Sequence, residues 1–286
     1  MTPTPVGMRC PECSSQRTEV RTMRSATSEP RVTIVLIIAC AVLFLATNGF
    51  SGGSGKLWTD LYLDGFDVHV NHDYWRLVTS GFLHSGPIHI LFNMYLLWLL
   101  GNLLEPTLGS GRFTALYFTA LLWGAFGALL FQHPFDSTVG ASGAVFGLMG
   151  AAAVEQRARG INPFQTDIGV LIILNLVLSF VISNISIGGH IGGLAGGILV
   201  GIVFEGADRM GRRELGYVGC VVLSAIAVVG ALATAGVDGS LHDQLAAASH
   251  AAWWLIAALG AGIVALGLAA STAGAQAGAE IGRAHV

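Results

Sequence analysis

Six polar side chains within or beside the long apolar stretches of this chain could take part in chemistry. A polar side chain inside a membrane is costly, so each is a functional candidate unless a neighbour pairs with it. A serine hydroxyl becomes a nucleophile when an imidazole takes its proton, and histidine, with an ordinary pKa of about 6.5, is such a base at neutral pH. Ser142 and His190 are therefore a candidate dyad for acyl transfer. The full set is His84, His89, Asn93, Ser142, Asn175 and His190.

Acyl transfer also needs hydrogen-bond donors aimed at the oxyanion that forms in the transition state. His89 and Asn93 are spaced i, i+4 and so share one helix face, while the backbone N–H of Ser142 lies near the start of its own span. These three donors form a candidate oxyanion hole, and an interhelical hydrogen bond is the alternative role for Asn93. Phe146, four residues after Ser142, is placed to stack on the imidazole. Since the two spans carry no acidic residue near this depth, packing would replace a carboxylate in orienting the ring.

The elements that carry these residues are predicted to be membrane helices. Of the 286 residues, 11% are charged and 53% are hydrophobic, and the mean hydropathy is +0.67, whereas an ordinary soluble domain has roughly 25% charged residues. This fraction of charged residues is too low to form the solvent-facing surface of a soluble globular enzyme. The expected fold class is all-α, a polytopic transmembrane helix bundle. Runs of about 20 apolar residues predict eight spans, of which the Ala/Gly-rich eighth is the weakest, near 32–50, 86–103, 113–131, 139–156, 167–184, 188–205, 215–236 and 251–271.

Arginine placement predicts the orientation of the bundle. With the N-terminus in the cytoplasm, twelve of the fourteen basic residues fall inside, and only Lys56 and Arg76 fall outside, in an external loop at 51–85. A net charge of −3 gives no support for nucleic-acid binding. The inner basic residues are Arg9, Arg17, Arg21, Arg24, Arg31, Arg112, Arg157, Arg159, Arg209, Arg212, Arg213 and Arg283.

In this orientation the second, fourth and sixth spans run inward, which puts His89, Ser142 and His190 in one layer, roughly 5–10 Å below the outer interface. Glycines spaced by four on the fourth and sixth spans follow the small-xxx-small pattern, which lets two helix backbones pack closely. Close packing would bring the Ser142 hydroxyl within reach of the His190 ring. These glycines are Gly143 and Gly147 on the fourth span, and Gly189, Gly193, Gly197 and Gly201 on the sixth.

The external loop at 51–85 holds four aspartates and four tryptophan or tyrosine residues besides its two basic residues. Because aromatic side chains commonly sit at the membrane interface, we expect the loop to lie partly in the headgroup layer. We interpret its charges as a solvated face rather than a ligand site. The aspartates are Asp60, Asp64, Asp67 and Asp73, and the tryptophan and tyrosine residues are Trp58, Tyr62, Tyr74 and Trp75.

Three regions are expected along the chain: a cytoplasmic tail at 1–31, a six-span core at 32–206, and a C-terminal extension with one or two further spans at 207–286. In the tail, Cys10 and Cys13 form half of a zinc knuckle, but a closed tetrahedral site needs four ligands and no second pair follows within the tail. We therefore expect a flexible, reduced tail without a metal. The other two cysteines, which lie in apolar runs and are interpreted as small core residues, are Cys40 and Cys220.

The motifs between Trp75 and Gly201 resemble those of the rhomboid family of intramembrane serine proteases. The Gly140-Ala-Ser-Gly143 segment is similar to the G-x-S-G nucleophile motif of the family's fourth helix, and the Gly189-His-Ile-Gly-Gly-Leu-Ala-Gly segment to its sixth. Three further features resemble the family's first external loop and second helix in type and spacing: the pair Trp75-Arg76, the residue His84, and the run from His89 to Asn93.

The resemblance implies a rhomboid-like six-helix core with one or two additional C-terminal transmembrane helices. It implies that Ser142 is the nucleophile, that His190 is the general base, and that His89, Asn93 and the Ser142 amide form the oxyanion hole. No cofactor is implied, and the partners would be transmembrane protein substrates and the lipid bilayer of a bacterial inner, or cytoplasmic, membrane. Residues with a supporting or structural role would be Phe146, where many family members have tyrosine, Gly140, Gly143, His84, Trp75, Arg76, Glu105 and Arg112.

By the same resemblance, the fifth span and the 183–188 connection would form a movable gate. Two other functions stay open. A catalytically inactive relative would bind transmembrane clients, which the presence of both Ser142 and His190 disfavours. A transporter or channel would need charged residues at the midplane, and the predicted spans lack them.

Overall fold

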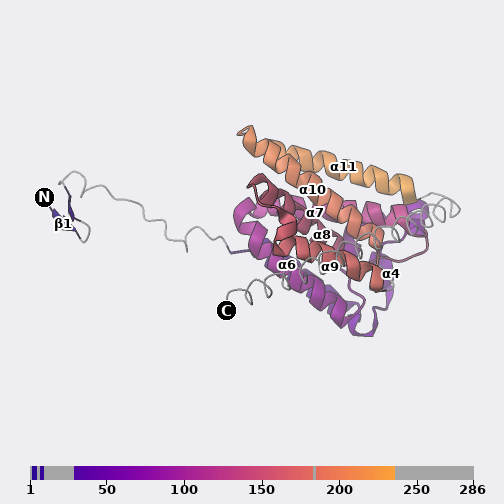
Figure 1. The fold of residues 1–286 in the computed structure, drawn as a ribbon. Helices are drawn as coiled ribbons and strands as arrows, with labels where there is room; N and C mark the ends of the chain where they lie inside the picture. Colours follow the sequence, from indigo (N-terminus) through magenta and orange to yellow (C-terminus); the bar gives the residue numbers. More distant parts are fainter. Residues whose placement is uncertain (1, 5–6, 10–28, 183–184, 236–286) are drawn as a thin grey trace, which may run out of the picture.

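The computed structural model describes residues 2–4, 7–9, 29–182 and 185–235, and long helices dominate the last two of these ranges (Figure 1). The long helices match the first seven predicted spans, while the eighth predicted span and the Cys10/Cys13 pair lie outside the described residues. Two three-residue strands, β1 (Thr2–Thr4) and β2 (Gly7–Arg9), pair antiparallel in the N-terminal tail. The long helices are α3 (Arg31–Ala46), α6 (Pro87–Leu108), α7 (Ser110–Phe131), α8 (Ser142–Ala158), α9 (Asp167–Val181), α10 (Ile187–Arg209) and α11 (Glu214–Ala235).

Four of these helices, α6, α7, α10 and α11, are long and apolar enough to cross a membrane, while α3 and α9 are shorter apolar helices. The chain is therefore a multi-pass membrane protein with the helical bundle that its composition predicts. Helix α7 lies centrally, beside α8 and α10, and 61% of its most apolar stretch is buried, against 22% for the peripheral α11 (Figure 1). The core around α7 includes Phe113, Leu116 and Tyr117, which are fully buried.

Glycines set the distance between the three central helices. A Cβ atom added at Gly193 of α10 would collide with the carbonyl oxygen of Gly143 on α8, and one at Gly197 with that of Gly147. Helix α7 joins the contact through Gly124, where an added Cβ would lie 3.1 Å from the Cα of Gly143. The predicted close approach of the fourth and sixth spans is therefore present, and it is backbone against backbone.

The external loop at 51–85 contains short helices: η1 (Gly49–Ser51) at its start, then α4 (Lys56–Leu61), the π-helical turn η2 (Asp67–Asn71), α5 (Arg76–Thr79) and η3 (Ser80–Phe82). Their charges correct the interpretation of a solvated face. Arg76 is buried, and its guanidinium pairs with Asp67 at 2.7 Å, Asp73 at 3.0 Å and Asp64 at 3.8 Å. It also donates to the carbonyls of Thr59 and Tyr62. These bonds hold the segments of the loop together, and only Asp60 keeps an exposed pairing, with Lys56.

The loop is tied in turn to the segment that leads into α8. Leu63 and Thr138 exchange two backbone hydrogen bonds, and the amides of Gly65 and Phe66 donate to the carbonyl of Pro134. The amide of Gly140 donates to the carbonyl of Ser80 at 2.9 Å. The loop therefore fixes the backbone just before Ser142.

At the opposite end of the bundle, two buried charges connect helices. The Glu105 carboxylate accepts hydrogen bonds from the Val32 and Thr33 amides at 2.9 Å, which satisfies free N–H groups in the first turn of α3. Arg112 of α7 pairs with Asp208 of α10 at 2.8 Å and lies over the Phe204 ring. Both contacts fit the structural roles that the family resemblance implies for Glu105 and Arg112.

Candidate active site

The Ser142 hydroxyl and the His190 ring meet where α8 and α10 begin. Ser142 is the first residue of α8, and His190 is the fourth residue of α10. The Ser142 Oγ lies 2.8 Å from Nε2 of His190, which is a good hydrogen-bond distance. The contact depends on the glycine packing, because a larger residue at Gly143 or Gly193 would move the helix starts apart. The predicted span began at 139, whereas α8 begins at Ser142 itself.

Phe146 packs against the histidine from one turn further along α8. Its ring is stacked on the His190 ring, with centroids 4.3 Å apart and an interplanar angle of 24°. Both side chains are buried. The stacking restricts rotation of the imidazole about its side-chain bonds, and so Phe146 orients the ring by packing, as its i+4 position predicts.

The other nitrogen of the ring has a partner that the sequence analysis missed. Ser179 of α9 places its Oγ 2.6 Å from Nδ1 of His190, and the same Oγ donates to the carbonyl of Asn175 at 2.7 Å. Asn175 was named among the polar residues of the fifth span, but its amide donates within α9, to the Leu171 carbonyl. The spacing i, i+4 between Asn175 and Ser179 was the available signal, since it puts both residues on one face.

The candidate oxyanion donors flank Ser142. His89, in the first turn of α6, accepts at Nδ1 from the Ser85 amide at 3.4 Å, so its proton belongs on Nε2. That Nε2 faces Gly140, where an added Cβ would lie 2.8 Å from it. Gly140 also has a φ of +128°, which favours glycine. The Nε2–H of His89 therefore lies beside the backbone that precedes Ser142.

Two neighbours of His89 have structural contacts. The Asn93 amide donates to the His89 carbonyl at 2.9 Å, so this bond is intrahelical rather than the interhelical one weighed as its alternative role. The second N–H of that amide remains available to a ligand. His84 is fully buried with its ring edge-on to that of His89, at 5.0 Å between centroids. Burial lowers the pKa of His84 to about 3, so the ring that supports His89 is neutral.

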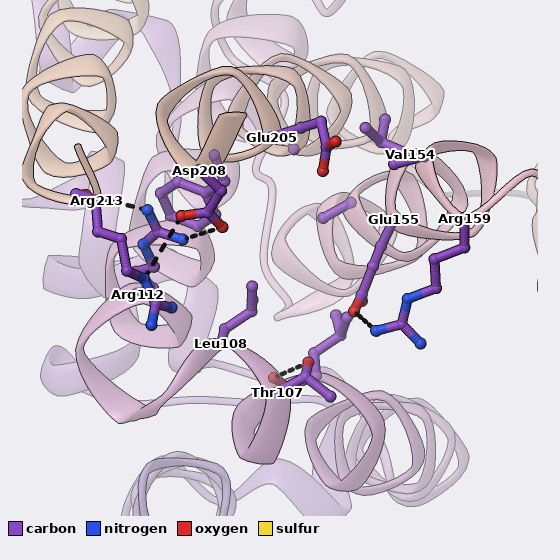
Figure 2. A pocket seen from close by; sticks show the side chains of 14 residues that line it. Thr107, Leu108, Arg112, Val154, Glu155, Arg159, Glu205, Asp208 and Arg213 are labelled. Atoms are coloured by element: carbon purple, nitrogen blue, oxygen red, sulfur yellow. Dashed lines mark hydrogen bonds and ion pairs between the residues drawn. The ribbon is translucent and has the colours of Figure 1, made fainter. Parts of the chain in front are cut away.

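A cavity of about 380 Å³ lies at the other end of the bundle and shares no residue with the dyad. Figure 2 shows that its walls carry charges of both signs, many of them paired. Among the described residues, no group of three or more His, Cys, Asp or Glu side chains is arranged to hold a metal ion. The labelled charged residues are Arg112, Glu155, Arg159, Glu205, Asp208 and Arg213.

Comparison with known proteins supports the motif analysis. Residues 71–206 match the model of the Rhomboid domain. Over 149 residues the chain is 37% identical to the Rhomboid protease GluP of Bacillus subtilis (strain 168). That alignment covers 49% of this chain and 28% of the relative, so the chain matches little more than a quarter of the relative's length. The matched domain contains Ser142, His190, His89 and Asn93, and the resemblance drawn from the motifs is confirmed.

Proposed function

Residues 71–206 match the Rhomboid domain, and from that match we propose that the chain is an intramembrane serine endopeptidase of the rhomboid family, acting through a Ser142–His190 dyad. Its substrates are other membrane proteins, cleaved in or near a transmembrane segment. The observation that carries the proposal is the 2.8 Å contact between Ser142 Oγ and His190 Nε2 at the start of two glycine-packed helices. The rhomboid domain and the 37% identity to a rhomboid protease support the same chemistry.

The reaction begins when Ser142 Oγ attacks the carbonyl carbon of the scissile peptide bond. The hydroxyl proton passes to Nε2 of His190, which becomes an imidazolium, and the carbonyl oxygen becomes an oxyanion. When the C–N bond breaks, Nε2 returns this proton to the leaving amine nitrogen and an ester remains on Ser142. A water then attacks the ester carbon and gives a proton to Nε2, and that proton returns to Ser142 Oγ as the new carboxylic acid leaves.

Three donors stabilise the oxyanion in this proposal. They are the Nε2–H of His89, the free amide N–H of Asn93 and the backbone N–H of Ser142. The last is one of the unpaired donors in the first turn of α8, where the helix dipole also favours negative charge. Removing a single oxyanion donor typically costs about 10²- to 10³-fold in rate.

The substrate segment has to unwind locally, because a peptide bond within a helix is held by its own hydrogen bonds. Residues that weaken a helix, such as glycine, serine or proline, should therefore favour cleavage when they lie near the scissile bond. Ser142 is only partly buried, which leaves its hydroxyl open to an approaching chain and to water.

The dyad faces the outside of the cytoplasmic membrane, and the N-terminus lies inside. Arginines at the end of the bundle opposite the dyad support this orientation by the positive-inside rule. They lie in or beside the terminal turns of α7, α8, α10 and α11, and are Arg112, Arg157, Arg159, Arg209, Arg212 and Arg213. The intact dyad geometry argues against the inactive client-binding alternative, because a binding protein has no need of a hydrogen-bonded serine and histidine.

Cleavage of a single-span reporter substrate by the purified protein in detergent tests the proposal. We expect Ser142→Ala and His190→Ala each to lower the cleavage rate by about 10³-fold or more. A matched control is Ser224→Ala, which removes a hydroxyl bonded to Thr119 between α7 and α11, away from the dyad. A fluorophosphonate should label wild type and Ser224→Ala but not Ser142→Ala. Cleavage that continues unchanged in Ser142→Ala would overturn the assignment.

A further inference from the structure

The imidazole of His190 lies between two serine hydroxyls that come from different helices. Nε2 contacts Ser142 of α8 at 2.8 Å, and Nδ1 contacts Ser179 of α9 at 2.6 Å. The proposed mechanism uses only the first contact. Ser179 is 2% exposed and His190 is 7% exposed, so water does not compete for the second contact.

The position of the Ser179 hydroxyl proton follows from the number of donors and acceptors around it. A serine hydroxyl has one proton to donate and two lone pairs to accept with. The Ser179 Oγ lies 2.7 Å from the carbonyl oxygen of Asn175 one turn earlier, which is the usual back-bond of a serine inside a helix. Two oxygens at that distance repel each other unless a proton lies between them, so the hydroxyl proton of Ser179 points to Asn175. The Oγ is then an acceptor toward His190.

A neutral imidazole carries its proton on one nitrogen only. Because the Ser179 Oγ accepts, that proton lies on Nδ1, and Nε2 keeps the free lone pair that faces Ser142. In the opposite tautomer, Nε2–H would point at Ser142 and the ring could not take the serine proton. The hydrogen bond from Nδ1 to Ser179 thus makes Nε2 the nitrogen that can accept the Ser142 proton.

We infer that Ser179 is a positioning residue of the proposed protease: through the chain Asn175 carbonyl, Ser179 hydroxyl, His190 Nδ1, it holds the ring in the tautomer that accepts the Ser142 proton. This inference rests on the proposed function. Ser179 takes the place that an acidic residue occupies in a Ser-His-Asp triad, and it does so without burying a charge.

The contribution of Ser179 grows during the reaction. When Nε2 takes the Ser142 proton, His190 becomes an imidazolium and its Nδ1–H is a charged donor, and hydrogen bonds from charged donors are roughly twice as strong as neutral ones. The bond to Ser179 therefore stabilises the transition state more than the ground state, which raises kcat rather than lowering KM.

The location of Ser179 also connects the dyad to the position of α9. The buried residues of α9 are Ile168, Gly169, Ile172, Asn175 and Ser179, and the rest of the helix surface is exposed or half-buried. Any displacement of the last turn of α9 from α10 lengthens the Ser179–His190 bond. The tautomer of the base is thus fixed only while α9 is docked at this end.

Kinetics of three variants test the inference. We expect Ser179→Ala to lower kcat about tenfold with KM nearly unchanged, because a charge-assisted hydrogen bond is lost only in the transition state. Ser179→Thr, which keeps the hydroxyl, should restore kcat to within about threefold of wild type. The control Ser224→Ala should leave both constants unchanged. Thermal unfolding of each variant in detergent shows whether the fold is retained.

The second readout is the tautomer itself, measured from the ¹⁵N chemical shifts of histidine-labelled protein, with His190→Gln used to assign the signal. We expect the Nδ1–H form in wild type and also in Ser142→Ala, because Ser179 sets it. A mixture of tautomers is expected in Ser179→Ala. A wild-type ring protonated on Nε2, or a Ser179→Ala kcat equal to that of Ser224→Ala, would overturn the inference while leaving the dyad intact. Failure of the dyad itself would show instead as cleavage by Ser142→Ala.

Discussion

Where α8 and α10 begin, their backbones touch, and the Ser142 and His190 side chains are hydrogen-bonded to each other. Where the same helices end, a cavity of about 380 Å³ separates them and its walls carry charges. In the proposed orientation the starts of α8 and α10 are the outer end and their last turns the inner end. The contact at the outer end is made by Gly143 and Gly147 against Gly193 and Gly197. At the inner end, side chains of α8 and α10 that line the cavity are Val154, Glu155, Phe204 and Glu205.

The difference shows what each end can do. The proposed proton transfer between Ser142 and His190 needs a short, fixed contact, here 2.8 Å, besides the correct ring orientation and tautomer, and glycine packing supplies that contact without charges that would need water. The inner end holds ion pairs whose carboxylates are partly exposed, such as Asp208 at 45%. Those pairs connect helix ends, and contact with solvent lowers the desolvation cost of their carboxylates.

The largest effect is expected from widening the glycine contact. In Gly193→Ala the new Cβ collides with the Gly143 carbonyl, so α8 and α10 must separate at the dyad. We expect the cleavage rate to fall by about 100-fold, since a displacement of roughly 1 Å has that cost, and the free energy of unfolding to fall by about 3 kcal/mol. Cleavage and thermal unfolding measure the two effects.

The matched control lies on the same helix at its inner end. An added Cβ at Gly206 meets nothing within 4 Å, so Gly206→Ala should keep full activity and stabilise α10 by about 0.5–1 kcal/mol through helix propensity. Equal losses of cleavage rate and of unfolding free energy in Gly193→Ala and Gly206→Ala would show that the two ends of the helix pair are packed alike.

The sequence predicted the glycine contact between α8 and α10 but not all of the contacts around the dyad. Glycine spacing predicted the contact of the fourth and sixth spans, and hydropathy predicted the described helices, because both are local patterns of residue type. Ser179 was missed because its partner, His190, lies eleven residues away across a chain reversal, and a serine in an apolar run is usually bonded to its own helix. Its helix bond exists as well, so the sequence signal was ambiguous.

The charges of the external loop were misread for a related reason. Asp64, Asp67, Asp73 and Arg76 look like a solvated set because charged residues usually are. The burial of Asp64 and Arg76 and the ion pairs of Asp67 and Asp73 depend on the loop folding back on itself and being tied to the 132–141 segment through Leu63 and Thr138. These are long-range contacts that residue spacing does not encode.

The second largest effect is expected at the ion-pair cluster around Arg76, which lies at the dyad end of the bundle. The ion pairs of Asp208 at the other end are more exposed. Arg76→Gln leaves three carboxylates without their cation and removes donors to the Thr59 and Tyr62 carbonyls. Breaking a buried ion pair from one side costs about 3 kcal/mol or more, and we expect thermal unfolding in detergent to show such a loss. The control Lys56→Gln, at an exposed pair with Asp60, should cost nearly nothing.

A smaller effect is expected at the inner end. Asp208→Asn removes the charge that pairs with Arg112 and Arg213, and because Asp208 is 45% exposed we expect a loss of only about 1 kcal/mol in unfolding free energy. The cleavage rate should stay within about twofold of wild type, since distant sites act independently. A tenfold loss of activity without unfolding would mean that the two ends are coupled.

The smallest effect is a pH dependence of the loop cluster. Burial raises the pKa of the Asp64 carboxyl to about 6, above its value of 3.8 as a free side chain, so the folded protein binds the Asp64 proton more tightly than the unfolded chain. The resulting stability is present in full below the unfolded pKa and is lost as pH rises through about 6. Asp64→Asn removes this dependence. The unfolding temperature of wild type relative to Asp64→Asn should therefore fall by about 2 °C between pH 5 and pH 7. Relative to the control Asp60→Asn, at the exposed pair with Lys56, it should not change, because that variant keeps Asp64.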